Sequence, residues 1–108
     1  MIQRREIKKW CASVAREFRP EQIIVFGSYG NGNPTEESDV DVLVVMPLTR
    51  GHRGVQAAAA IRERVPAAFP MDVIVRSPQE IAQRLAVGDG FIASVMRDGQ
   101  TMYDGEHA

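Results

Sequence analysis

The sequence predicts a single domain of the α/β (α+β) class over residues 1–108, with a mixed β-sheet flanked by helices. Three observations carry this prediction. The length of 108 residues is enough for one hydrophobic core and too short for two. The composition, 44% hydrophobic and 25% charged residues, is that of a folded globular protein. Short apolar runs typical of strands alternate along the chain with amphipathic segments typical of helices.

The first half of the chain predicts one helix and two strands. Residues 7–18 place apolar side chains at helical spacing, and a proline two positions later ends that helix. Residues 22–26 form a short β-branched run, which predicts a buried strand. Residues 29–38 are rich in glycine and polar side chains and predict a loop with room for one helical turn. Residues 40–46 predict a second strand, which a proline terminates.

The second half predicts a helix, a strand, two further helices and a short edge strand. Ser77 and Glu80 form a capping-box pattern with Pro78 at the first helical position, so a helix begins there. Glycines follow both of the last two helices and close them. The expected elements span residues 54–65, 71–75, 78–88, 90–98 and 101–103.

The charged residues are unevenly distributed along the chain. Thirteen Lys and Arg against fourteen Asp and Glu give a net charge of −1, which removes the electrostatic basis for general nucleic-acid binding. Residues 20–49 nevertheless hold five acidic residues and no Lys or Arg. Such a segment is costly by self-repulsion unless cations bind or screen it. A solvated acidic loop would show the same composition, so the spacing of the carboxylates has to decide between the two.

The sequence also indicates where the domain operates. One cysteine, Cys11, excludes an intramolecular disulfide and an all-cysteine zinc site. The basic N-terminus lacks the apolar segment of a signal peptide, and no apolar run approaches the ~20 residues that span a bilayer. We therefore expect a cytoplasmic domain without a membrane partner.

Two aspartates open the second predicted strand. Asp39 and Asp41 are separated by one residue, so on a strand their side chains point to the same face with Cα atoms ~6.5 Å apart. Carboxylates at this spacing can converge on two divalent cations ~3.5–4 Å apart, as in phosphoryl transfer. Two exposed aspartates at the mouth of a strand would show the same pattern.

Two further features favour a functional site over that simpler interpretation. Gly27 and Ser28 follow the first strand, where glycine allows close approach of the backbone and where hydroxyl and N–H groups can donate to phosphate oxygens. A plain turn would explain this pair alone. Asp72 lies just inside the third strand and joins the face of the other two aspartates if that strand pairs beside the second.

The combined pattern resembles the motif of the nucleotidyltransferase superfamily typified by DNA polymerase β, especially its minimal nucleotidyltransferase (MNT) domains. The resemblance covers nearly the whole chain and implies the nucleotidyltransferase fold. Asn31 departs from the pattern, because relatives often carry a basic residue there. The matching residues are Gly27, Ser28, Asp39, Asp41 and, as the third carboxylate, Asp72.

The resemblance implies transfer of AMP from ATP with release of pyrophosphate. It assigns the binding of nucleotide phosphates to Gly27 and Ser28. It makes the three aspartates the catalytic and metal-binding residues: Asp39 and Asp41 would bind two Mg²⁺ ions, and Asp72 would hold the catalytic metal and help deprotonate the attacking hydroxyl.

The sequence contains few features that identify the acceptor of the reaction. Larger relatives hold the acceptor with a second domain, for which 108 residues leave no room. The chain also resembles the antitoxins of HEPN–MNT toxin–antitoxin pairs, in which the MNT domain can modify a tyrosine of the HEPN ribonuclease. This implies a HEPN toxin as partner. Two alternatives stay open: an antitoxin that neutralises its partner by binding alone, and transfer to a small molecule such as an aminoglycoside.

Two groups of residues keep two interpretations each. Arg50 and Arg53 follow the strand of the aspartates and fit either a solvated loop or a contact with a triphosphate. The apolar positions of the last helix fit either the core or an extension into a partner interface. These positions are Phe91, Ile92, Val95 and Met96.

Overall fold

The computed structural model describes residues 1–105, so the last three residues of the expected domain lie outside the described range. Within it, no helix is long and apolar enough to cross a membrane. The elements are α1 (Arg4–Phe18), β1 (Gln22–Phe26), α2 (Gly27–Asn31), β2 (Val40–Val45), α3 (Gly54–Arg64), β3 (Met71–Arg76), α4 (Pro78–Ala86), α5 (Gly90–Asp98) and β4 (Gln100–Asp104).

The four strands form one mixed sheet in the order β3-β2-β1-β4. β1 pairs antiparallel with β2 on one side and with β4 on the other, which makes β4 the predicted edge strand. β2 and β3 pair in parallel and are connected through α3. The sheet and its flanking helices confirm the predicted fold class.

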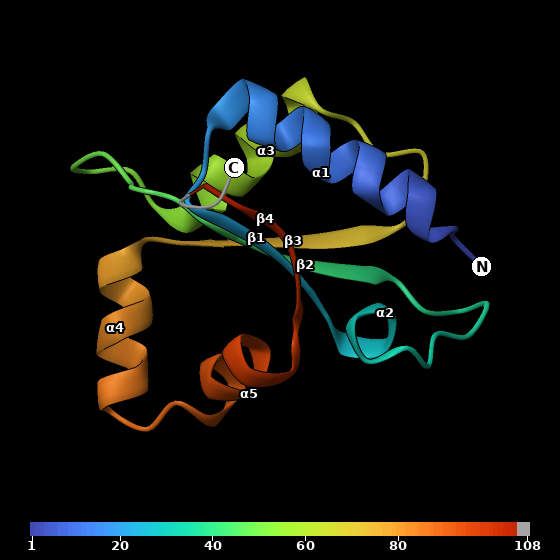
Figure 1. The fold of residues 1–108 in the computed structure, drawn as a ribbon. Coiled ribbons are helices and arrows are strands. Elements are labelled where there is room, and N and C mark those ends of the chain that lie inside the picture. The colour runs from blue at the N-terminus through green and yellow to red at the C-terminus, as the bar shows by residue number, and fades with distance from the viewer. Residues whose placement is uncertain (106–108) are drawn as a thin grey trace.

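Helices cover both faces of the sheet (Figure 1). Alternate residues of β2 pack into different layers, because successive side chains on a strand point to opposite faces. Val42 and Val44 pack in a cluster with residues of α1 and α3, such as Val14 and Ile61. Leu43 packs on the other face, in a second cluster with residues of α4 and α5.

The helix α1 is fixed to the sheet by its apolar stripe. Trp10 and Val14 are buried on this stripe, and the indole N–H of Trp10 donates to the carbonyl of Val65 at 2.8 Å. Burial raises the pKa of the Cys11 thiol to about 12, so this side chain stays protonated and serves as a small core residue. Arg19 adopts the left-handed conformation that ends the helix before Pro20.

The boundaries differ from the sequence prediction mainly around α2. This helix begins at Gly27, where the sequence predicts the end of a strand and the start of a loop. Its glycine-rich sequence gives almost no helical signal, since glycine has a low helix propensity. α1 also begins three residues earlier than predicted, and α4 ends two residues before Gly88.

Candidate active site

The structure brings two of the predicted aspartates side by side. Asp41 of β2 and Asp72 of β3 are register partners in the parallel ladder, so their side chains leave the sheet on the same face. Asp39 lies two residues before Asp41, immediately ahead of β2, and belongs to the same end of the sheet. The third strand therefore pairs beside the second, as the predicted place of Asp72 beside the other aspartates requires.

The three carboxylates form a centre of uncompensated negative charge. Asp41 is half-buried, whereas Asp39 and Asp72 are exposed. Burial raises the pKa of Asp41, and the negative charges of Asp72 and then Asp39 raise that pKa further. Within residues 1–105 no Lys or Arg forms an ion pair with any of the three.

These carboxylates suit a divalent cation by charge and by donor chemistry. Mg²⁺ prefers carboxylate oxygens and retains several waters, and a cation here would relieve the repulsion that raises the pKa of Asp41. The side chains do not form a closed site, however: in the described part of the chain no three His, Cys, Asp or Glu side chains are arranged to hold a metal ion. Metal binding by Asp39, Asp41 and Asp72 therefore remains a prediction, which requires their side chains to converge.

Gly27 lies directly against the Asp41 carboxylate. Its neighbour Phe26 is the register partner of Asp41 across the antiparallel pair, which brings the start of α2 to the aspartates. Gly27 has a φ of +68°, and a Cβ at this position would overlap the Oδ2 atom of Asp41. The backbone conformation therefore favours glycine, and a Cβ here would displace the carboxylate of Asp41. Ser28 follows in the first turn of α2 and is half-buried.

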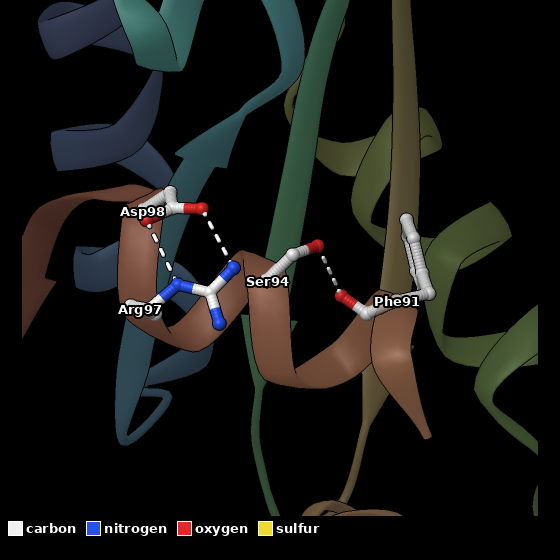
Figure 2. Close-up of polar contacts among 4 residues, drawn as sticks. All are labelled: Phe91, Ser94, Arg97 and Asp98. Atoms are coloured by element: carbon white, nitrogen blue, oxygen red, sulfur yellow. Dashed lines mark hydrogen bonds and ion pairs between the residues drawn. The ribbon is translucent and has the colours of Figure 1, made fainter. Parts of the chain in front are cut away.

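A cavity of about 350 Å³ lies beside Gly27, between α2 and α5. Figure 2 shows the α5 side of this region, where the Ser94 hydroxyl donates to the Phe91 carbonyl at 2.8 Å. Arg97 pairs there with the carboxylate of Asp98 through Nε and Nη2, both at 3.1 Å. The lining residues are Phe26, Gly27, Asn31, Phe91, Ser94, Val95, Asp98 and Gly99.

Sequence reasoning missed this cavity because it treated the apolar residues of α5 as one set. Ile92 and Val95 are buried in the core, but Phe91 is 50% exposed and packs edge-to-face on Phe26 with ring centroids 5.6 Å apart. A signal was present in the spacing. Ile92, Val95 and Met96 follow the i, i+3, i+4 pattern of a core face, which leaves Phe91 at its edge.

The sequence profile of the nucleotidyltransferase domain family matches residues 7–99. The chain belongs to this family. A Methanocaldococcus jannaschii protein, named as a candidate protein adenylyltransferase, is 40% identical over 47 residues, which are 42% of this chain and 47% of that protein. The match thus spans about half the relative's length.

A solved structure supports the same fold. The crystal structure of a candidate nucleotidyltransferase from Sulfolobus solfataricus superposes with a TM-score of 0.66 at 21% sequence identity. The superposition covers 94% of this chain and 80% of the other. The four-stranded mixed sheet is therefore the architecture of a nucleotidyltransferase domain.

Arg50 and Arg53 are not brought to the aspartates of this nucleotidyltransferase domain. Both follow the carboxyl end of β2, whereas Asp39 and Asp41 lie at its amino end. Asn31, the departure from the family motif, lines the cavity beside Gly27 and brings no positive charge to it. In the described part of the chain, Arg50, Arg53 and Asn31 therefore bring no positive charge to a triphosphate bound at the aspartates.

Proposed function

We propose that this nucleotidyltransferase domain transfers AMP from ATP to a hydroxyl group of a partner protein. The observation that carries the proposal is the register pairing of Asp41 with Asp72, with Gly27 in contact distance of the Asp41 carboxylate. Family membership supports nucleotidyl transfer. The name of the Methanocaldococcus jannaschii relative supports a protein acceptor, and that match covers 47% of the relative.

The proposed chemistry is an in-line displacement at the α-phosphorus of ATP. The acceptor hydroxyl oxygen forms a bond to this phosphorus, the bond to the oxygen bridging the β-phosphate breaks, and pyrophosphate leaves. The carboxylate of Asp72 takes the hydroxyl proton. Asp39, Asp41 and Asp72 would hold two Mg²⁺ ions, whose chemistry when bound is to offset the charge that develops on the phosphate oxygens.

Gly27 and Ser28 have separate roles in binding the outer phosphates. The absence of a side chain at Gly27 lets the backbone approach the nucleotide beside Asp41. The hydroxyl of Ser28 donates a hydrogen bond to a phosphate oxygen. The cavity of about 350 Å³ between α2 and α5 provides space for part of the nucleotide next to these residues.

For the acceptor we propose a tyrosine hydroxyl on a HEPN-type toxin, so that the chain acts as its antitoxin in the cytoplasm, where ATP and Mg²⁺ are present. The resemblance of the chain to the antitoxins of HEPN–MNT pairs supports this partner. The exposure of Asp39 and Asp72 supports it as well, since a side chain on a separate protein can reach them.

The experiment is to incubate the chain with the protein encoded by its neighbouring gene, in the presence of Mg²⁺ and ATP labelled on the α- or the γ-phosphate. We expect the α-label alone to become attached to a tyrosine, with a mass increase of one AMP. Asp41→Asn should abolish the transfer, and Glu63→Gln, an exposed substitution on α3, should leave it unchanged.

Two results would overturn the proposed acceptor. A tight complex that silences the partner without added mass, in the wild type and in Asp41→Asn alike, would establish neutralisation by binding alone. Transfer of the α-label to an aminoglycoside, with none to the protein, would establish a small-molecule acceptor.

A further inference from the structure

A basic cavity lies at the end of the sheet opposite the aspartates. β2 and β3 are parallel, so both begin at the aspartate end and both finish at this one. Asp72 and Arg76 are four residues apart on β3, or ~13 Å at ~3.3 Å per residue. The cavity has a volume of about 480 Å³ and lies among the β2–α3 loop, the start of α3 and the start of α4. Figure 1 shows this loop at the far end of the sheet from α2.

The cavity is lined by basic side chains that have no acidic partner. Within residues 1–105, none of its arginines forms an ion pair. Arg76 Nη1 donates to the Val75 carbonyl at 2.9 Å and lies 3.3 Å from where a Cβ on Gly54 would be, over the first residue of α3. The basic residues are Arg50, His52, Arg53 and Arg76.

One acid, Glu80, also lines the cavity, and it already has a structural role. Its carboxylate accepts a hydrogen bond from the Ser77 N–H at 2.9 Å, in the capping box of α4. Against the three arginines, Glu80 leaves a net charge of +2 around the cavity. The cavity therefore carries an excess of positive charge in a concave space.

This excess is unfavourable in the absence of an anion. Like charges gathered in one place repel one another. Arg53 is the N-cap residue of α3, and Arg76 lies over the same end, where the positive pole of the helix disfavours a cation. A bound anion would offset both effects.

We propose that this cavity binds the phosphate group of a small ligand, either free phosphate or pyrophosphate, or the phosphates of a nucleotide. Arginine favours this chemistry, because its planar guanidinium donates paired hydrogen bonds to phosphate oxygens. The position also fits, since open α/β sheets bind ligands outside the carboxyl ends of their parallel strands. The concave shape favours the binding of a small anion over the binding of a partner protein through a flat surface. The site uses none of Asp39, Asp41 and Asp72, and it stands or falls independently of the transfer reaction.

The test is calorimetric titration of the full chain carrying Asp41→Asn, in EDTA, with phosphate, pyrophosphate and ATP in turn. We expect saturable binding that weakens at higher ionic strength. Arg53→Gln with Arg76→Gln should raise the Kd by ~10-fold or more, because charge-assisted hydrogen bonds are lost. Arg62→Gln, an exposed arginine of the same helix outside the cavity, is the matched control and should leave the Kd unchanged.

A second variant keeps the test independent of arginine removal. Glu80→Gln preserves the capping box, since glutamine also serves at this position, but removes the opposing charge. It should bind phosphate more tightly than the parent chain. Tighter binding of ATP than of phosphate would identify a nucleotide as the ligand, and the reverse would identify the free anion. No saturable binding of any of the three, or an unchanged Kd in the double arginine variant, would overturn the proposal.

Discussion

Asp41 is held in surroundings that disfavour its ionised form. Burial raises its pKa, and the neighbouring carboxylates of Asp72 and Asp39 raise it further. The folded state therefore keeps the proton of Asp41 to a higher pH than the unfolded state does. The resulting loss of stability is absent below the unfolded pKa, ~3.9, and develops as the pH rises through the folded value.

Asp41→Asn is accordingly expected to raise the Tm of the metal-free chain at neutral pH, because the substitution removes the cost of burying a charge and the repulsion by Asp72 and Asp39. The gain should shrink toward zero at a pH of about 3, where the carboxyl group is protonated in both states. Thermal unfolding in EDTA at the two pH values measures the difference. A variant less stable than the wild type at neutral pH would show that burial and repulsion of the charge are not the dominant effects at this residue.

Gly27 and Gly32 form a matched pair that tests whether the close approach of Gly27 to Asp41 matters for activity. Both have positive φ, but a Cβ on Gly27 would overlap Asp41, and a Cβ on Gly32 would meet no atom within 4 Å. Each alanine substitution should cost about 1–2 kcal/mol of stability through backbone strain. Gly27→Ala alone should also remove nucleotidyl transfer, since it displaces Asp41. The activity and the free energy of unfolding are measured for both variants. If the two variants lose equal activity, Gly27 serves only as a plain turn.

At the scale of elements, α4 depends on a cap that the sequence shows directly. Ser77 Oγ accepts a hydrogen bond from the Glu80 N–H at 3.1 Å, which satisfies one otherwise unpaired helix donor. Ser77→Ala should therefore lower the free energy of unfolding by about 0.5–2 kcal/mol. Ser94→Ala is the control, because the Ser94 hydroxyl donates to the Phe91 carbonyl within α5 and caps no helix end. The expected change is within about 0.5 kcal/mol. Urea denaturation distinguishes the two, and equal effects would argue against the cap.

Local signals explain which elements the sequence predicts well. The capping box of α4 and the apolar run of β1 are encoded within a few neighbouring residues, and the structure confirms both. The helix α2 has no such signal, because its sequence, Gly27–Asn31, is rich in glycine and its place is set by the pairing of Phe26 with Asp41. That pairing joins segments separated by a long loop, and the periodicity of the sequence does not predict such a pairing.

At the scale of the whole molecule, the net charge of −1 conceals two opposite poles. The parallel pair β2–β3 separates them, with the aspartates at its amino end and the arginines of the basic cavity beyond its carboxyl end. The sequence predicts the acidic pole, because Asp39 and Asp41 lie two positions apart where one strand begins. The basic pole is not predictable in the same way, since Arg76 reaches Arg50 and Arg53 only through the register of β3 beside β2.

The Mg²⁺-dependent binding of a nucleotide tests the central claim that Asp39, Asp41 and Asp72 form a nucleotidyl-transfer site. The measurement is calorimetric titration with a non-hydrolysable ATP analogue, in Mg²⁺ and again in EDTA, so that binding independent of the metal is subtracted. We expect Mg²⁺-dependent binding in the wild type and in Glu63→Gln, and its loss in Asp39→Asn with Asp41→Asn. Mg²⁺-dependent binding that persists unchanged in this double variant would contradict the account.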